Sequence, residues 1–498
     1  MKKVFPFYPL LLGVVWVLAT YSNNVERLPS IASITAPLLV VVSVTAAVLG
    51  STQLLVKDWK KSALVTAVIL TLTIFHGYIR DFTNTDGLTA SPIWLALMVA
   101  GVLVVLKLTR STGRLHLTII ANVVSISILL VTLVGIFTST AVSADREYPY
   151  TPSSISSVHN PTPDVYYIIP DTFTNLRVLE NYLDYDFGDE FYDFLYSRGF
   201  HVSPTSYANY HNTILSISSV LNMKYWTDED LGSSPAYFLG RSLFQNPVVD
   251  TFKEAGYTYA HIGSWWDYTA TNVRSDVTYR YSTLSELSFA LYRTTLWYDL
   301  ADIFDKGGNS ILRSSTLGQF DSLVEVSKME DSTFTFAHIL LPHPPFLFDS
   351  EGGYISAWMV PPEEWRSYYL GQLEYTTKLI ESTIDQILAN SKVPPIIIVA
   401  SDEGYGGTDW QNYWQEAKGL DSIWEDRPDL VIKRQGAFYA ILNPYGGSFT
   451  LPKSPVNTFM YVFNSLFGSG LEYLPDRYFL RSLGEYPGKF IEITDKLR

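Results

Sequence analysis

Five long apolar runs in the first 140 residues constrain this chain more than any other feature of its sequence. Each run approaches the ~20 residues that an α-helix needs to cross ~30 Å of hydrocarbon. A single such run could be a buried core helix, but five nearly uncharged runs separated by short polar loops favour membrane spans. No small-residue cleavage site follows the first run, which argues against a cleaved signal peptide. We predict spans at approximately residues 5–21, 32–55, 63–79, 91–108 and 116–138.

The basic residues of this region lie mostly in alternate loops. Eight Lys and Arg residues precede the first span or lie between spans two and three and between spans four and five, whereas the other loops contain only Arg27 and Arg80. The positive-inside rule therefore places the N-terminus in the cytoplasm. Because five is odd, the rest of the chain would emerge on the outer face. We predict a multi-pass protein of the plasma (inner) membrane with an extracytoplasmic C-terminal domain.

Charge separates the chain into two parts. The first 140 residues contain ten Lys/Arg and four Asp/Glu, whereas the rest contains 25 Lys/Arg and 45 Asp/Glu. The part of the chain after residue 140 is therefore too acidic to bind nucleic acid well, because the phosphates of nucleic acid require a cationic surface. The chain has no cysteine, which excludes disulfides and thiolate metal ligands.

A stretch rich in Ser, Thr and Pro, "TAVSADREYPYTPSSISSVHNPTP", follows the last apolar run. Such composition is typical of a linker. We therefore divide the chain into a transmembrane domain at residues 1–139, a linker at 140–163 and an outer domain at 164–498.

The outer domain alternates short apolar runs with amphipathic stretches such as "YYLGQLEYTTKLIESTIDQILAN". Strands that are continuously apolar and separated by helices indicate an α/β domain with a mostly parallel central sheet covered by helices on both faces. The predicted strands are residues 165–170, 257–263, 333–341, 395–401 and 437–443.

Two of these strands are followed directly by acids. Asp171 follows "VYYIIP", and Asp402 and Glu403 follow "PIIIVAS". Ligands of such sheets bind beyond the carboxyl ends of the strands, and carboxylates there can hold a divalent cation. Taken singly, Asp171 could be a helix N-cap, and the glycines of "EGYGG" are compatible with a solvated turn at Asp402 and Glu403.

A hydroxyl residue, Thr213, opens the apolar helical pattern of "NYHNTILSISSVLNMKYW". It could simply be an N-cap. Alternatively it is a nucleophile, because a helix N-terminus stabilises negative charge on its oxygen and on an incoming phosphate. Asn212, directly before it, is a candidate substrate-binding residue.

Other candidates carry weaker signals. His343, in "PHPPF" after a strand, is equally compatible with a structural and a substrate-facing role, whereas we expect His338, inside the strand pattern, to be a packed core histidine. Trp265, in "GSWWDYTATN", could line a sugar or headgroup pocket, although a place in the core fits it at least as well.

The order of these motifs resembles the sulfatase-like branch of the alkaline phosphatase superfamily. An acid follows the first strand, a Thr begins the next helix, and "PHPPF" precedes a strand followed by Asp. The five spans and the outer domain resemble membrane-anchored lipoteichoic acid synthases and phosphoethanolamine transferases. The resemblance covers residues 164–480 and includes "SPVNTFMYVFNSLFG" and "YLPDRYF" near the C-terminus.

This resemblance implies site roles. Asp171 and Asp402 would be metal ligands, and Thr213 would be both the nucleophile and a metal ligand. The family has a His directly after the second Asp, where this chain has Glu403, and all eight histidines lie at or before His343. Glu403 as a ligand would favour Mn, Mg or Ca over Zn for one divalent ion.

The function that follows is a metal-dependent phosphoryl-group transferase. It would act on a membrane lipid or lipid-linked phosphodiester donor and on a cell-envelope glycan or lipid acceptor. A phosphodiester or sulfate ester hydrolase with the same site is the first alternative, and a non-catalytic protein that binds glycan or a partner is the second. The Cys/Ser-x-Pro-x-Arg pattern that family sulfatases need for their formylglycine is absent, which disfavours a true sulfatase.

Overall fold

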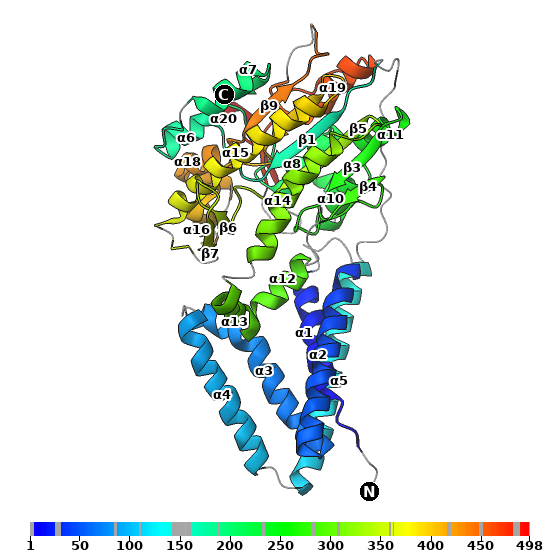
Figure 1. Cartoon of the computed structure of the whole chain (residues 1–498), viewed down its shortest axis with the longest axis vertical. Helices are drawn as coiled ribbons and strands as arrows, with labels where there is room; N and C mark the ends of the chain where they lie inside the picture. Colours follow the sequence, from blue (N-terminus) through cyan, green and yellow to red (C-terminus); the bar gives the residue numbers. More distant parts are fainter. Residues whose placement is uncertain are drawn as a thin grey trace. The chain divides into compact units, whose positions relative to one another are not determined.

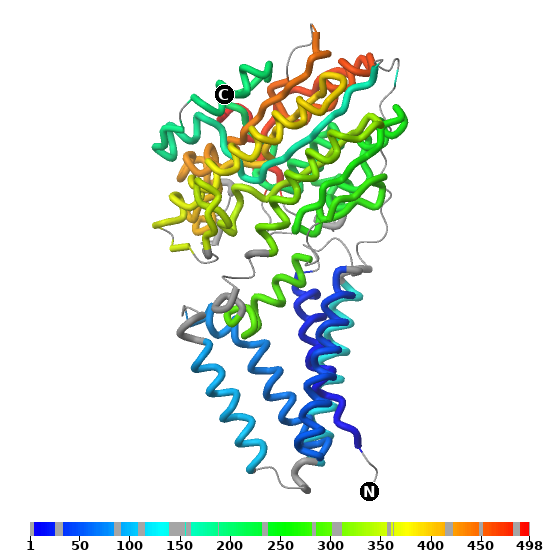
Figure 2. Tube along the Cα trace, in the orientation of Figure 1, coloured from blue at the N-terminus to red at the C-terminus, as the bar shows by residue number. Residues whose placement is uncertain are grey.

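The computed structural model describes residues 4–24, 31–83, 87–108, 111–141, 155, 161–187, 189–231, 235–280, 285–305, 309–357, 360–361, 363–415, 420–447, 452–481 and 489–497. The chain forms two compact units (Figures 1 and 2). Residues Met1–Asp145 and Leu284–Ser310 form the first, and Arg146–Thr283 and Ile311–Arg498 form the second. Most of the predicted linker at 140–163 lies outside the described residues.

The first unit contains the apolar helices α1 (Tyr8–Asn23), α2 (Thr35–Val56), α3 (Trp59–Thr83), α4 (Gly87–Leu108) and α5 (Ser111–Ala141). Within the described residues, three helices are long and apolar enough to cross a membrane: α2, α3 and the Leu115–Thr138 part of α5. Helix α1 has 16 residues, and the apolar part of α4 spans only Ser91–Lys107. The described residues therefore contain three candidate membrane spans, and the five-span bundle stays a prediction.

The first unit also includes α12 (Glu286–Arg293) and α13 (Leu296–Asp305), which lie within the range predicted for the outer domain. Buried Asp299 of α13 accepts a 2.6 Å hydrogen bond from Arg80 Nη1 of α3, and its other oxygen lies 3.0 Å from His76 Nδ1. The Gly77 amide donates to the Thr294 carbonyl at 2.7 Å. Because buried charges need partners, these contacts account for the grouping of α12 and α13 with α3.

The second unit is built on a seven-stranded sheet with the order β2-β9-β8-β1-β5-β3-β4. Only β9 runs against its neighbours, so the sheet is mostly parallel, as predicted. The five predicted strands agree with the observed ones to within two residues at each end. The strands of this sheet are β1 (Val165–Pro170), β2 (His201–Ser203), β3 (Thr258–Ile262), β4 (Val277–Tyr279), β5 (Thr333–Ile339), β8 (Ile396–Ala400) and β9 (Tyr439–Leu442).

Helices and two small hairpins complete this unit, and α14 and α15 run along the sheet in Figure 1. The helices are α6 (Leu176–Tyr182), α7 (Glu190–Ser197), α8 (Thr213–Asn222), α9 (Asp228–Leu231), α10 (Pro235–Phe244), α11 (Pro247–Glu254), α14 (Asn309–Val326), α15 (Trp365–Asn390), α16 (Gly407–Gln415), α17 (Leu420–Asp426), α18 (Pro428–Gln435), α19 (Thr458–Phe467) and α20 (Thr494–Leu497). The hairpin strands are β6 (Phe346–Phe348), β7 (Tyr354–Ala357), β10 (Phe479–Arg481) and β11 (Phe490–Glu492).

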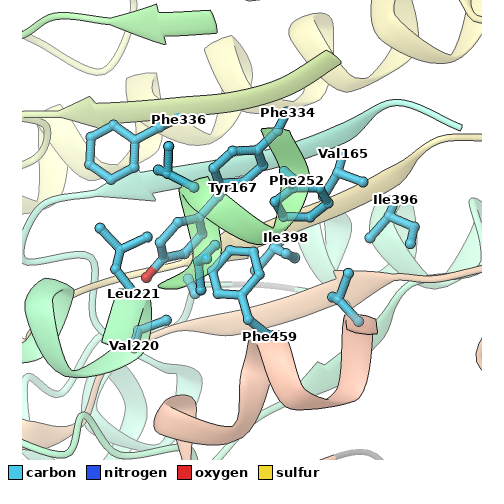
Figure 3. Close-up of a cluster of buried hydrophobic side chains, with 14 of the residues drawn as sticks. Val165, Tyr167, Val220, Leu221, Phe252, Phe334, Phe336, Ile396, Ile398 and Phe459 are labelled. Atoms are coloured by element: carbon cyan, nitrogen blue, oxygen red, sulfur yellow. The ribbon is translucent and has the colours of Figure 1, made fainter. Parts of the chain in front are cut away.

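One face of the sheet carries the main hydrophobic core. Successive side chains of a strand point to opposite faces, so every second residue of β1, β5 and β8 contributes to this core, beneath α8, α11 and α19. Figure 3 shows Phe252, Phe334 and Phe459 gathered beside Tyr167 of β1. The rings of Phe252 and Phe334 stack with centroids 4.3 Å apart. This packing fixes α8 and the three strands relative to one another.

We expect Phe334→Ala to lower the free energy of unfolding by about 3–5 kcal/mol, because it leaves a cavity in a fully buried ring cluster. Chemical unfolding followed by Trp fluorescence measures the change. Tyr196→Ala is the matched control, since Tyr196 is 51% exposed in the same unit and should lose less than about 1 kcal/mol. A similar loss in both variants would contradict this account of the core.

Candidate functional site

Three ionisable side chains extend the core face at the carboxyl ends of three neighbouring strands. Strand β1 lies between β5 and β8, and Ile169 of β1 pairs with His338 of β5. His338 continues the alternation of Phe334 and Phe336, and Asp402 lies two residues beyond Ala400, which ends β8 in the same core. The residue two positions after Ile169 is Asp171. The alternation that builds the core thus brings Asp171, His338 and Asp402 together.

These three residues form a group that fits a metal ion. Each is buried, and each offers one ligand atom within 4.8 Å of the others. Asp171 Oδ1, His338 Nε2 and Asp402 Oδ2 have no hydrogen-bond partner within the described part of the chain. Buried polar atoms normally form hydrogen bonds, so three that converge without any, with His338 Nε2 only 3.7 Å from Asp171 Oδ2, indicate the place of a cation.

The imidazole of His338 is oriented for such a role. Its Nδ1 lies 2.9 Å from the Thr269 hydroxyl, and its ring meets the edge of Trp266 at 5.6 Å. A hydrogen bond at one ring nitrogen fixes the orientation of the other, as is usual for metal-binding histidines. Burial lowers the pKa of His338 to about 3, so the ring is neutral and its Nε2 can act as a ligand.

Thr213 is the first residue of α8, and Asn212 before it occupies the N-cap position without a capping bond from its side chain. The Thr213 hydroxyl lies close enough to the carboxylates of Asp402 and Glu403 to oppose the rise of their pKa values. It therefore does not cap the helix but faces the acidic group. The partial positive charge of the helix N-terminus falls at the same place.

The carboxylate of Glu403 forms an ion pair with Arg434. Its Oε1 pairs with Nη2 of Arg434, in the last turn of α18. Gly404 permits this approach, because its amide donates to the Arg434 carbonyl at 2.7 Å and a Cβ there would lie 2.4 Å from the Lys433 carbonyl oxygen. Glu403, predicted as a metal ligand, lies beside the Asp/His/Asp group, but its Oε1 pairs with Arg434.

Burial raises the pKa values of all three acids. The pKa of Asp171 lies well above its ordinary value because of burial and because of the nearby Asp402 and Glu403. Burial raises the pKa of Asp402 to about 6, against hydrogen bonding from Thr213 and the charge of Arg434, and raises that of Glu403 to about 8. A bound cation would favour the ionised forms and reverse these shifts.

The turn after β1 is strained. Thr172 has φ 59°, a left-handed conformation that is rare for a β-branched residue. Its carbonyl accepts a 2.8 Å hydrogen bond from the Tyr369 hydroxyl of α15, and its amide donates to Asp402 Oδ1 at 3.4 Å. These contacts hold the backbone in this form and fix Asp171 against Asp402. Such strain is characteristic of functional sites.

The remaining predicted residues occupy different places. His343 is half-buried, and Arg434 and His338 lie close enough to it to interact electrostatically. Asn212 precedes the nucleophile candidate, and its Oδ1 has no partner in the described part of the chain. Trp265 is half-buried, and its neighbour Trp266 is the tryptophan that contacts His338.

Two functional candidates escaped the sequence reasoning. His338 was expected to be packed, but it belongs to the Asp/His/Asp group; its position on the core face, two residues after Phe336, could have revealed it. Nothing in the sequence singled out Arg434 as a site residue. Basic residues are common near the C-termini of solvent-exposed helices, so its position alone did not indicate a function.

The family model described as Sulfatase matches residues 160–437, more than half of the chain. The chain belongs to the sulfatase family. The matched part of this sulfatase-family protein includes the Asp/His/Asp group, Thr213 and Arg434. The family match confirms the resemblance to the sulfatase-like branch of the alkaline phosphatase superfamily. It also supports the prediction that the protein is an enzyme. No curated protein sequence matches the chain.

The solved structures to which the chain is similar are distant. The periplasmic domain of EptC from Escherichia coli is 15% identical, with a TM-score of 0.44, and the match covers 67% of this chain and 93% of that one. The lipooligosaccharide phosphoethanolamine transferase EptA from Neisseria meningitidis is 12% identical, with a TM-score of 0.35 and coverage of 86% and 88%. The periplasmic domain of EptC from Campylobacter jejuni is 13% identical, with a TM-score of 0.38 and coverage of 65% and 96%. Since each TM-score is below 0.5, the family assignment rests on the sulfatase model.

Proposed function

We propose that this protein is a membrane-anchored, metal-dependent transferase that moves a phosphoryl group from a lipid-linked phosphodiester to a glycan or lipid of the cell envelope. One observation carries the proposal: the hydroxyl of Thr213, the first residue of α8, lies close to the carboxylates of Asp402, in the buried Asp/His/Asp group, and of Glu403. A hydroxyl so placed is suited to nucleophilic attack on phosphorus.

The residues of the site fit one divalent ion. Asp171, His338 and Asp402 would hold it through their unpartnered atoms, and Thr213 is adjacent. When bound, the ion would neutralise phosphoryl oxygens and lower the pKa of a hydroxyl. The preference for Mn, Mg or Ca over Zn assumed that Glu403 is a ligand. Because Glu403 pairs with Arg434 and His338 adds a nitrogen donor, the ligand set of two carboxylates and one imidazole fits both Mn and Zn.

The chemistry would proceed in two steps. In the first, the Thr213 oxygen bonds to the donor's phosphorus as the bond from phosphorus to the lipid alcohol breaks; the hydroxyl proton passes to the Glu403 carboxylate and the alcohol leaves protonated by water. In the second, an acceptor hydroxyl bonds to phosphorus and gives its proton to the hydroxide that the first step left, the bond to Thr213 breaks, and Thr213 regains a proton from Glu403. Glu403 Oε2, which has no partner in the described part of the chain, is available for this exchange.

The membrane spans suit a lipid donor, which is met at the bilayer surface. The distribution of Lys and Arg supports an N-terminus in the cytoplasm and a catalytic unit on the outer side. The sulfatase family assignment favours a second candidate, a phosphodiester hydrolase, in which water takes the place of the acceptor hydroxyl. Product analysis with a lipid donor distinguishes the two.

We expect the purified full-length protein to contain about one divalent ion per chain and an Asp402→Ala protein to contain essentially none, because the variant lacks a central ligand. Elemental analysis after incubation with Mn, Mg and Zn measures this. Asp385→Ala is the control, since Asp385 is exposed and pairs with Arg198. Absence of metal in the wild type under all three conditions would contradict the metal site and favour the binding-protein alternative.

A further inference from the structure

The guanidinium of Arg434 is fixed beside the acidic group by two of its three nitrogens. Nη2 pairs with Glu403 Oε1, and Nε donates to the His211 carbonyl at 3.2 Å. The indole of Trp410 lies 5.9 Å from the guanidinium carbon. A side chain held in this way has lost most of its rotamer freedom before any ligand arrives.

The third nitrogen, Nη1, makes no hydrogen bond within the part of the chain that the structure describes, and the Arg434 side chain is 16% exposed. Gly406 leaves room at this nitrogen, because a Cβ there would come within 2.7 Å of Nη1. Arg434 is also close enough to lower the pKa values of Asp171, Asp402 and His343 by its charge. The guanidinium therefore lies within electrostatic reach of the acidic group, and its Nη1 edge lies beside Gly406.

Charge balance requires a cation at this position. Asp171, Asp402 and Glu403, once ionised, carry three negative charges, of which a divalent ion offsets two. Without a further cation the site would repel an anionic phosphodiester. Arg434 offsets the third charge, so that an incoming phosphate meets a site with no net negative charge.

We propose that Arg434 binds a non-bridging oxygen of the phosphoryl group through Nη1, with Glu403 as the residue that positions the guanidinium. The inference deepens the proposed function and rests on it for the identity of the anion. Arginine is well suited to such a task because its planar donors match phosphate oxygens. A single resident metal ion and one arginine would then share the neutralisation of the transferred group.

Inorganic phosphate is the probe for this site. We expect Arg434→Met to weaken phosphate binding to the full-length protein by about tenfold or more, as for loss of a charged hydrogen bond. Calorimetric titration with Mn and again with EDTA gives the affinity, and elemental analysis shows whether the variant keeps its metal. Arg427→Met is the control, because Arg427 is 41% exposed and pairs with Asp429; its phosphate affinity should equal that of the wild type.

A second pair of variants separates a direct role from a structural one. Arg434→Met leaves Glu403 buried without its cation, and this carboxylate could repel phosphate by itself. Glu403→Gln should bind phosphate at least as tightly as the wild type, and the double variant Glu403→Gln/Arg434→Met should remain about tenfold weaker. Recovery of wild-type affinity in the double variant, or full affinity in Arg434→Met under both conditions, would overturn the proposal.

These outcomes are independent of catalysis. If phosphate binding depends on Arg434 but no phosphoryl group is transferred to Thr213, the anion site is real and the proposed transferase function fails. If transfer occurs and phosphate binding does not depend on Arg434, the transferase survives and this inference fails.

Discussion

A Thr213→Ala protein should lose transferase activity by about ten-thousandfold while keeping its divalent ion. The magnitude is that expected when a nucleophile is removed from a site that otherwise remains intact. The metal should stay because the Asp/His/Asp group does not depend on the hydroxyl. The assay is the release of diacylglycerol from a glycerophospholipid labelled in its acyl chain, with the full-length protein in detergent micelles.

Thr213→Ser is the matched control for this variant. It keeps the hydroxyl at the first position of α8 and should retain activity to within about tenfold. Mass spectrometry of acid-quenched wild type should also find the phosphoryl group on the peptide that contains Thr213. Substantial activity in Thr213→Ala would exclude the covalent step, and loss of metal in that variant would show that Thr213 is a ligand rather than only a nucleophile.

The fold of the outer unit could be predicted because its strands are buried on both faces. Such strands are continuous apolar runs, and "VYYIIP" and "PIIIVAS" correspond closely to β1 and β8. The alternation of a parallel sheet then placed Asp171 and Asp402 at neighbouring strand ends. The sequence determined the membrane part less well, because apolar composition does not fix helix length. Among the described residues, three helices are long and apolar enough for a span, whereas five spans were predicted.

The pairing of ionisable side chains could not be predicted in the same way. Arg434 and Glu403 are separated by 31 residues, and only the close approach of Gly404 to the end of α18 brings them together. Similarly, Asp299 lies more than two hundred residues after its partner Arg80, so residues 284–310 gave no sign that they group with the N-terminal helices. Long-range ion pairs leave no periodic signal in a sequence, whereas strands and amphipathic helices do.

Asp402→Asn should change the stability of the protein in opposite directions with and without metal. Without metal, burial raises the pKa of Asp402 to about 6 from an ordinary 3.8. The folded state therefore binds this proton more tightly than the unfolded state. Stability from this group is fully present below pH 3.8 and is lost as the pH rises through 6. Since one pKa unit corresponds to about 1.4 kcal/mol, the loss reaches roughly 3 kcal/mol by pH 8.

The Asp402→Asn variant does not lose this unfolding free energy at high pH, because asparagine cannot ionise. In EDTA it should equal the wild type near pH 4 and exceed its unfolding free energy by roughly 2–3 kcal/mol at pH 8, where it also relieves the repulsion of Asp171 and Glu403. With Mn at about a hundred times its Kd, the wild type should gain about 2.7 kcal/mol and the variant nothing. Thermal unfolding at both pH values measures this, with exposed Asp385→Asn as the control. A variant that is less stable than the wild type at pH 8 in EDTA would contradict the raised pKa of Asp402 and the mutual repulsion of the three buried acids.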